Sequence, residues 1–128
     1  MPNALIFDVD GVLADTEPIS VRTLNRAFKQ EHAIVVRDED SIPFMGRTAA
    51  KHVIGIAKQY GVYDTADIPA LIELHESLFD EEILAIDDLV IAPSRDLLHH
   101  IATLDDWTVG LATSSTRSRS ELTIRRCD

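Results

Sequence analysis

Apolar residues form two short continuous runs, and helical spacing fills the long stretch between them. One run covers Ala4 to Val9 and the other covers Thr108 to Ala112. Uninterrupted apolar runs of this length are typical of buried strands in parallel sheets. The pattern therefore predicts two fully buried strands with a helical block inserted between them, and so an α/β fold.

Between the runs, apolar residues at intervals of three and four predict successive helices. The first helix follows Thr16, a candidate N-cap, and its buried face is formed by Val21, Leu24, Ala27 and Phe28. The polar stretch Glu31 to Ser41 is expected to be a loop. A second helix follows Thr48 and ends near Gly61, with Val53, Ile56, Ala57 and Tyr60 on one face.

Further helices are expected on both sides of the second strand. Asp67 and Pro69 open a helix whose apolar face includes His75, which we expect in the core. Pro93 is expected to break the chain and Ser94 to cap a short helix that ends before the second strand. After the hydroxyl-rich turn at Thr113 to Thr116, residues 117–126 have weak helical character.

Composition and charge narrow the function. The 128 residues are 45% hydrophobic and 27% charged, which is ordinary for one globular domain. A net charge of −10 argues against a nucleic-acid partner, because no basic stripe is present to neutralise phosphates. No stretch reaches the apolar length of a membrane span. The single cysteine, Cys127, fits a reducing compartment, so a cytoplasmic protein without membrane association is expected.

Two carboxylates stand at the end of the first run. Asp8 and Asp10 are two residues apart, so in an extended segment both point to the same side. Their mutual repulsion would be relieved by a hard cation such as Mg²⁺. One carboxylate is then suited to attack as a nucleophile and the other to transfer protons. Gly11 permits a tight turn there, although a solvated strand end accounts equally well for this motif alone.

The second run also ends in polar residues. Thr113, Ser114 and Ser115 precede a helix whose first turn offers unpaired backbone N–H groups. Hydroxyl groups beside a helix N-terminus form a site suited to a phosphate. The two strand ends together predict a metal and nucleophile half and a phosphate-binding half.

These motifs resemble those of the haloacid dehalogenase superfamily, in the branch with a helical cap after the first strand. FDVDGVLADTEP is similar to the first motif of that family, and GLATSS is similar to the second. The nearest group comprises sugar-phosphate and phosphoglycolate phosphatases together with beta-phosphoglucomutase. The resemblance implies a Rossmann-like parallel core at residues 1–14 and 91–128 and a cap at residues 15–90.

The resemblance also implies a phosphoric monoester hydrolase that acts on small phosphorylated metabolites. In such an enzyme, Asp8 would form an aspartyl-phosphate, and Asp10 would be the general acid and then the general base. Mg²⁺ would be held by the Asp8 carboxylate and the Asp10 backbone carbonyl. Thr113, with Ser114 beside it and Gly11 in the turn, would bind the phosphoryl group, and Arg47 would contact the rest of the substrate.

The sequence departs from this family downstream of the second motif. The family has a later lysine and a later acidic motif, whereas the lysines here are Lys29, Lys51 and Lys58, all within the expected cap. We therefore expect only the first part of the core, as in a C-terminally truncated member. Two alternatives stay open: a non-catalytic fragment that needs a missing C-terminal segment or a partner chain, and a phosphomutase.

Overall fold

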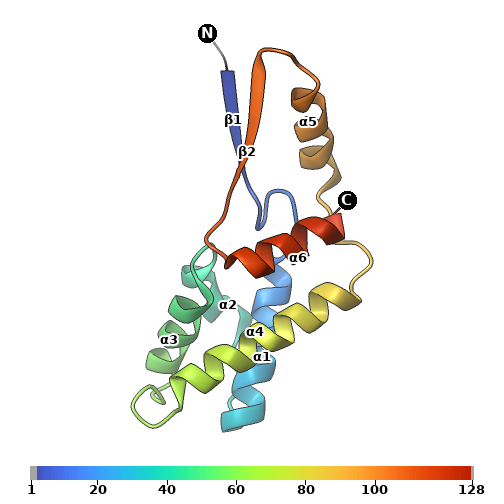
Figure 1. The fold of residues 1–128 in the computed structure, drawn as a ribbon. Helices are drawn as coiled ribbons and strands as arrows, with labels where there is room; N and C mark the ends of the chain where they lie inside the picture. The colour runs from blue at the N-terminus through green and yellow to red at the C-terminus, as the bar shows by residue number, and fades with distance from the viewer. Residues whose placement is uncertain (1–2, 128) are drawn as a thin grey trace.

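The computed structural model describes residues 3–127, which form one two-stranded parallel sheet and a group of helices. Strand β1 (Asn3–Asp8) pairs with β2 (Trp107–Ala112), and Asp8 lies opposite Ala112. In Figure 1 the two strands form a narrow arm above the helices, with α5 (Ala92–Ala102) beside β2. The carboxyl ends of both strands point toward the helical part, which brings the two motifs together.

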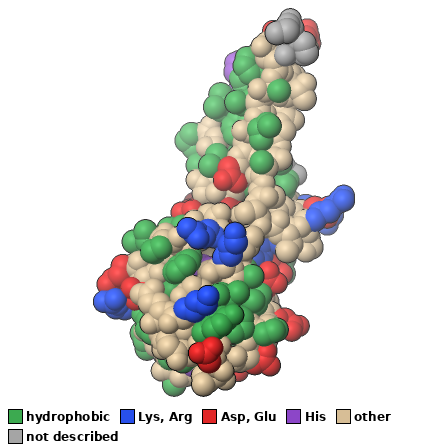
Figure 2. Space-filling view, turned by 90° about the vertical axis from the view of Figure 1, so that its left-hand side faces the viewer, with side chains coloured by type: hydrophobic (Ala, Val, Ile, Leu, Met, Phe, Trp, Pro, Cys, Tyr) green, Lys and Arg blue, Asp and Glu red, His purple; other side chains and the backbone are tan. Residues whose placement is uncertain are grey.

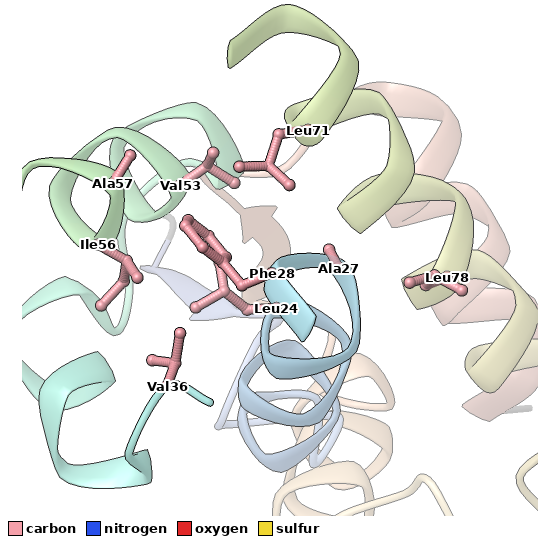
Figure 3. Packing of buried hydrophobic residues seen from close by; sticks show 9 residues of the cluster. All are labelled: Leu24, Ala27, Phe28, Val36, Val53, Ile56, Ala57, Leu71 and Leu78. Atoms are coloured by element: carbon pink, nitrogen blue, oxygen red, sulfur yellow. The ribbon is translucent and has the colours of Figure 1, made fainter. Parts of the chain in front are cut away.

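The helical part is built from α1 (Glu17–His32), α2 (Asp38–Ser41), the 3₁₀ turn η1 (Ile42–Phe44), α3 (Ala49–Gln59) and α4 (Ile68–Ala85). Its buried cluster is shown in Figure 3 and contains Leu24, Ala27, Phe28, Val36, Val53, Ile56, Ala57, Leu71 and Leu78. Helices α1 and α3 supply most of this cluster, and α4 closes it. The faces predicted for the first two helices are therefore confirmed, except that Tyr60 is only partly buried.

Local signals fix where these helices begin. The Thr48 hydroxyl accepts a hydrogen bond from the Lys51 backbone N–H at 3.3 Å, as an N-cap should. The Asp67 carboxylate does the same for the Ala70 N–H at 3.1 Å at the start of α4. Both predicted helix starts are confirmed.

Helix α6 (Arg117–Cys127) lies against the helical part rather than against the strands (Figure 1). Leu122 packs on a second buried cluster, formed by Ala14, Ile19, Phe79, Ile83 and Leu89. This cluster joins the base of the strands to α1 and α4. No helix within residues 3–127 has the length and apolar character needed to cross a membrane.

The chain crosses between the strands and the helices at two neighbouring segments. The Asp15 N–H donates to the Leu89 carbonyl at 2.8 Å, and the Ile91 N–H donates to the Leu13 carbonyl at 2.9 Å. Ala14 and Val90 thereby form an antiparallel bridge. The two crossings are held together as a short paired connection.

The expectation of fully buried strands is wrong. Ile6 is 68% exposed and Leu111 is 45% exposed, while Phe7 is buried. Each strand has one neighbouring strand, and none of the described residues of α5 is buried. Figure 2 shows the result as a slender projection on a broad helical base. The apolar runs form strands, but much of the surface of these strands is left uncovered.

Three other expectations on helix boundaries also need correction. Helix α1 runs to His32, and Asp38–Ser41 forms α2, so the stretch expected as loop is partly helical. Helix α5 begins at Ala92 with Ile91 as its N-cap, so Pro93 lies in its first turn and Ser94 does not cap it. Proline is tolerated there because an N–H group in the first turn of a helix has no acceptor within that helix. The division at residues 15 and 90 stays a prediction, and residues 1, 2 and 128 lie outside the described part.

Candidate active site

The chain turns sharply directly after Asp8, the last residue of β1. The Val9 carbonyl accepts hydrogen bonds from the N–H groups of Leu13 and Ala14, both at 3.0 Å. Gly11 has a φ of +76°, a conformation that side chains disfavour, and a Cβ there would lie 3.3 Å from the Glu17 carboxyl group. The tight turn predicted for Gly11 is present, and it turns Asp10 back toward the helices.

Three hydroxyl groups surround the Asp10 carboxylate. Thr16 Oγ1 donates to Asp10 Oδ1 at 2.7 Å, while Ser115 Oγ and Thr113 Oγ1 donate to Oδ2 at 3.0 and 3.2 Å. The donors come from the start of α1 and from the turn after β2, more than ninety positions apart in sequence. The prediction that the two strand ends lie close together is therefore confirmed at Asp10.

Thr16 lies at the N-cap position of α1, as expected, but it does not cap the helix. Its side chain makes no hydrogen bond to the first turn and is directed to Asp10 instead. The residue is only 2% exposed. A buried hydroxyl needs a partner, and here that partner is the carboxylate.

Asp8 is exposed and more open than Asp10. Its Oδ1 accepts a hydrogen bond from the Val9 N–H at 2.8 Å, which fixes the orientation of the carboxylate. None of the hydrogen bonds between residues 3 and 127 reaches Asp8 Oδ2. This oxygen is available to an incoming group.

The turn after β2 divides its hydroxyl groups between two directions. The Thr113 hydroxyl accepts from the Ser115 N–H at 3.0 Å, and Ser115 contacts Asp10. Ser114, which is predicted to bind phosphate, donates to the Gly46 carbonyl at 3.4 Å. The turn thus touches both the carboxylate and the loop before α3.

A cavity of about 350 Å³ lies between this turn and the helices. Its lining includes Asp10, Ser114 and Ser115, Arg47 from the loop before α3, and residues of α3 and α4. Its size suits a small ligand, since such sites begin near 300 Å³. Arg47 is exposed and takes part in none of the ion pairs found among residues 3–127.

Arg119 also lines this cavity and is buried. Its Nε donates to Asp80 Oδ1 at 3.2 Å and its Nη2 donates to the Glu76 carbonyl at 3.1 Å. The guanidinium lies 4.2 Å from the centre of the Phe79 ring. These contacts join α6 to α4 and pair the arginine charge with Asp80.

Two buried histidines also line the cavity. Burial lowers the pKa of His52 to about 4. Burial, with smaller contributions from His52 and Arg119, lowers the pKa of His75 to about 3. Both rings are therefore uncharged near neutral pH, and the prediction that His75 lies in the core is confirmed, since it is 1% exposed.

The position of His52 depends on a ring that packs on it. The Phe44 ring stacks on His52 with 5.9 Å between centroids and 25° between planes. A Cβ at Gly55 would lie 2.1 Å from the Phe44 ring. Glycine at that position therefore leaves the space that Phe44 occupies.

The donors near Asp8 are compatible with Mg²⁺. No three His, Cys, Asp or Glu side chains within residues 3–127 gather into a metal-binding group. Mg²⁺ often uses only one or two carboxylates and completes its shell with water and substrate phosphate. Asp8 Oδ2, which accepts no hydrogen bond from residues 3–127, is suited to be one such ligand. The Asp10 carbonyl is suited to be a second, because none of the described backbone hydrogen bonds outside helices and strands ends at it.

Of the predicted site residues, Asp10, Ser114 and Arg47 line the cavity, and Thr113 contacts Asp10. Asp8 and Gly11 are not among the lining residues. Sequence reasoning missed the roles of Thr16 and Ser115 as Asp10 partners and did not consider His52. Ser115 could have been found as the third hydroxyl residue of the TSS run at 113–115. His52 could have been found because it lies four residues before Ile56, on the same helix face.

The chain belongs to the haloacid dehalogenase-like hydrolase family, whose sequence model matches residues 5–128. The predicted family and its α/β fold with a helical insertion are confirmed. No curated protein sequence gives a significant match.

Several solved structures share the fold. Beta-phosphoglucomutase from Clostridium difficile has a TM-score of 0.84 and 17% identity, over 99% of this chain and 57% of that one. A hydrolase from Pseudomonas syringae has a TM-score of 0.78 and 17% identity, over 100% and 57%. CbbY from Rhodobacter sphaeroides, solved in complex with phosphate, has a TM-score of 0.76 and 20% identity, over 98% and 57%. This chain thus spans little more than half the length of these structures.

Proposed function

We propose that this chain carries the phosphoryl-transfer site of a magnesium-dependent phosphatase acting on a small phosphorylated metabolite. The main support is the convergence of three hydroxyl groups from two distant segments on the Asp10 carboxylate. That convergence lies where the carboxyl ends of the two parallel strands meet, the usual ligand position in open α/β sheets. Membership of a hydrolase family supports the same reaction class.

In the first step, Asp8 Oδ2 attacks the phosphorus atom of the phosphomonoester. The bond between phosphorus and the leaving oxygen breaks as the bond to Asp8 forms, and Asp10 gives its proton to that oxygen. Because a hydroxyl group both donates and accepts, one of the three contacts to Asp10 can reverse when the carboxyl carries a proton. The hydroxyl groups therefore support both protonation states that the step requires.

In the second step, Asp10 accepts a proton from water as the water oxygen attacks the phosphorus of the aspartyl-phosphate. The bond from phosphorus to Asp8 breaks, and inorganic phosphate leaves with both Asp8 and Asp10 restored. Thr113 and the backbone N–H groups at the start of α6 orient the phosphoryl oxygens. Arg47 binds the part of the substrate that lies in the cavity.

Asp8 and the Asp10 carbonyl would hold Mg²⁺, which supplies charge neutralisation for the phosphoryl oxygens when bound. The test is release of inorganic phosphate from p-nitrophenyl phosphate by the purified protein, with Mg²⁺ and with EDTA. Release that depends on Mg²⁺ and is lost in Asp10→Asn supports the proposal. The control is Asp15→Asn, an exposed carboxylate outside the cavity. No release above the buffer rate contradicts the proposal for this chain.

A second candidate is a phosphate-binding protein without turnover. It is favoured by the scarcity of cations around the cavity, where the described residues offer only Arg47 and an Arg119 already paired with Asp80. Binding of inorganic phosphate in calorimetry, without phosphate release, would support this candidate. Recovery of the phosphoryl group on a second sugar hydroxyl, rather than in water, would instead indicate a phosphomutase.

A further inference from the structure

Arg119 is a buried arginine that the proposed reaction does not use. It belongs to the first turn of α6, directly after the turn that carries Thr113 and Ser115, and it is 8% exposed. An arginine is buried to this extent only where its charge is paired. Within residues 3–127, every hydrogen bond, ion pair and ring contact of its guanidinium goes to one helix, α4.

These contacts follow one face of α4. Glu76, Phe79 and Asp80 are three and four positions apart, so they lie together on the helix surface. The planar guanidinium donates in two directions at once, from Nε to the Asp80 carboxylate and from Nη2 to the Glu76 carbonyl. The Phe79 ring supports it from a third direction. Together the three contacts fix the guanidinium on α4 more firmly than a single ion pair would.

A second arginine makes the same kind of connection at the other end of α6. Arg126 is seven positions after Arg119 and therefore about two helical turns away on the same face. Its Nε donates to the Ile83 carbonyl at 3.3 Å, and its Nη2 donates to the Ile86 carbonyl. Ile83 is likewise seven positions after Glu76, so α6 and α4 run side by side in the same direction (Figure 1). Of the two arginines, only the first stands at the end that follows the site hydroxyl groups.

The first turn of α6 connects this attachment to the site. The Arg119 N–H donates to Thr116 Oγ1 at 3.4 Å, and the N–H and hydroxyl of Ser120 both donate to the Thr116 carbonyl at 3.0 Å. Thr116 is thus bound to the helix through its side chain and its backbone. Ser115, the residue before it, donates to Asp10 Oδ2 at 3.0 Å. The position of α6 on α4 therefore sets the position of the Ser115 hydroxyl group.

The turn itself has little other support. Thr113, Ser114 and Thr116 are exposed, and the strand that leads to them pairs with a single neighbour. From the helical part the turn also meets the Gly46 carbonyl, which accepts from Ser114 at the longer distance of 3.4 Å. The position of the turn therefore depends largely on the helix that follows it.

We propose that Arg119 and Asp80 form a positioning pair for Asp10. The pair holds the first turn of α6 on α4, and through that turn it keeps the Ser115 hydroxyl within hydrogen-bond distance of Asp10 Oδ2. Asp80 is not among the residues that line the cavity, so it acts on the reaction without touching the substrate. This inference rests on the proposed function and adds to it two residues that orient the acid and base.

The first test needs no turnover. The Ser115 N–H donates to Thr113 Oγ1 at 3.0 Å, so its hydrogen exchange reports whether the turn is held in place. In Asp80→Ala, NMR should show this amide exchanging about tenfold faster than in the native protein, the size expected when one hydrogen bond is lost. Glu81→Ala removes the neighbouring carboxylate, which pairs with Arg26 instead, and should leave the rate unchanged. Equal rates in the two variants overturn the positioning pair, whatever the protein catalyses.

The second test measures phosphate release from p-nitrophenyl phosphate with Mg²⁺. Asp80→Ala and Arg119→Met should each lower kcat about tenfold without raising KM more than about twofold, because the lost contacts orient Asp10 and do not bind the substrate. Asp80→Asn keeps an oxygen for Arg119 Nε and should recover most of kcat. Arg126→Met removes the equivalent attachment at the far end of α6 and should leave kcat unchanged. A higher KM at constant kcat in Arg119→Met would make this residue a substrate contact and overturn the positioning role.

A double-mutant cycle identifies the path. If α6 acts through the Ser115 hydroxyl, Arg119→Met should lower kcat no further in a Ser115→Ala background, so the two effects should not add. Full additivity overturns the proposal. Thermal melting checks that each variant is folded, and the Asp80 variants serve if Arg119→Met unfolds, since the Asp80 side chain is 47% exposed. Absence of phosphate release from the native protein contradicts the proposed function, whereas the exchange measurement still decides whether the pair holds the turn.

Discussion

The helices between residues 17 and 85 and the two strands differ sharply in how they are stabilised. The helices enclose a continuous buried cluster around Phe28, whereas the two strands, which lead to Asp8 and to Thr113, are largely exposed. Residues of the proposed chemistry thus stand on the part with little packing, and the part with dense packing supplies one wall of the cavity. Stability and chemistry are separable here, so substitutions should affect one without the other.

The largest separation should come from Asp8→Asn. It removes the proposed nucleophile, so phosphate release should fall by roughly three orders of magnitude or more, as for nucleophiles elsewhere. The free energy of unfolding should not change measurably, because the Asp8 side chain is exposed. Phosphate assays and urea unfolding of the same preparation measure the two effects. Retained activity would remove Asp8 from the mechanism.

On the packed side, Phe28→Ala should cost about 3–5 kcal/mol of unfolding free energy, the usual range for a buried aromatic. Phe28 is fully buried at the centre of the cluster (Figure 3). Urea titration measures the change. Leu84→Ala, at an exposed position on α4, is the matched control, and a similar loss there would contradict the contrast between packed and exposed positions.

Gly55→Ala should cost about 1–3 kcal/mol, because its methyl group would displace the Phe44 ring. Phe44→Leu together with Gly55→Ala should recover part of the stability, since the smaller side chain leaves room. Thermal melting of both variants measures the change in stability. An unchanged melting temperature in the single variant would argue against this packing.

Acid should destabilise the helical part through its histidines. The folded-state pKa values of His52 and His75, about 4 and about 3, lie below the unfolded value of 6.5. The unfolded chain therefore binds more protons between these limits, and stability falls as the pH drops below about 6.5. The slope should be on the order of 1.4 kcal/mol per pH unit for each histidine. Urea titrations at pH 7, 6 and 5 measure it, and His52→Phe should lower the slope.

The smallest effect is expected for Ile6→Thr on β1. The side chain is 68% exposed and keeps its β-branched shape, so the unfolding free energy should change by less than about 0.5 kcal/mol. A large loss would mean that the strand surface is covered in solution. Equilibrium unfolding by urea gives the comparison with Phe28→Ala.

The sequence predicted the elements better than their surroundings. Periodicity located the three long helices between Thr16 and Ala85, though not the short α2, because their faces pack within a short stretch of chain. The same reasoning overestimated burial at Ile6, since an apolar run reports what a strand prefers and not which segments cover it. Whether a strand is covered depends on its contacts with residues that are distant in sequence.

The site was predictable to the level of its motifs. Asp10, Gly11 and Thr113 meet as expected, because parallel strand ends share an edge of the sheet. The direction of each hydroxyl was not predictable: Ser115 points to Asp10 and Ser114 to Gly46, and one turn of backbone decides which. His52 was overlooked because its partner His75 lies on another helix.

The paired crossing at Ala14 and Val90 has a mechanical consequence. Two separate tethers would let the helices twist, slide and tilt relative to the strands, whereas two tethers bonded to each other act as one strap. Because Thr16 lies two residues from Ala14, this strap fixes the start of α1 against the end of β1, and with it the hydroxyl that contacts Asp10.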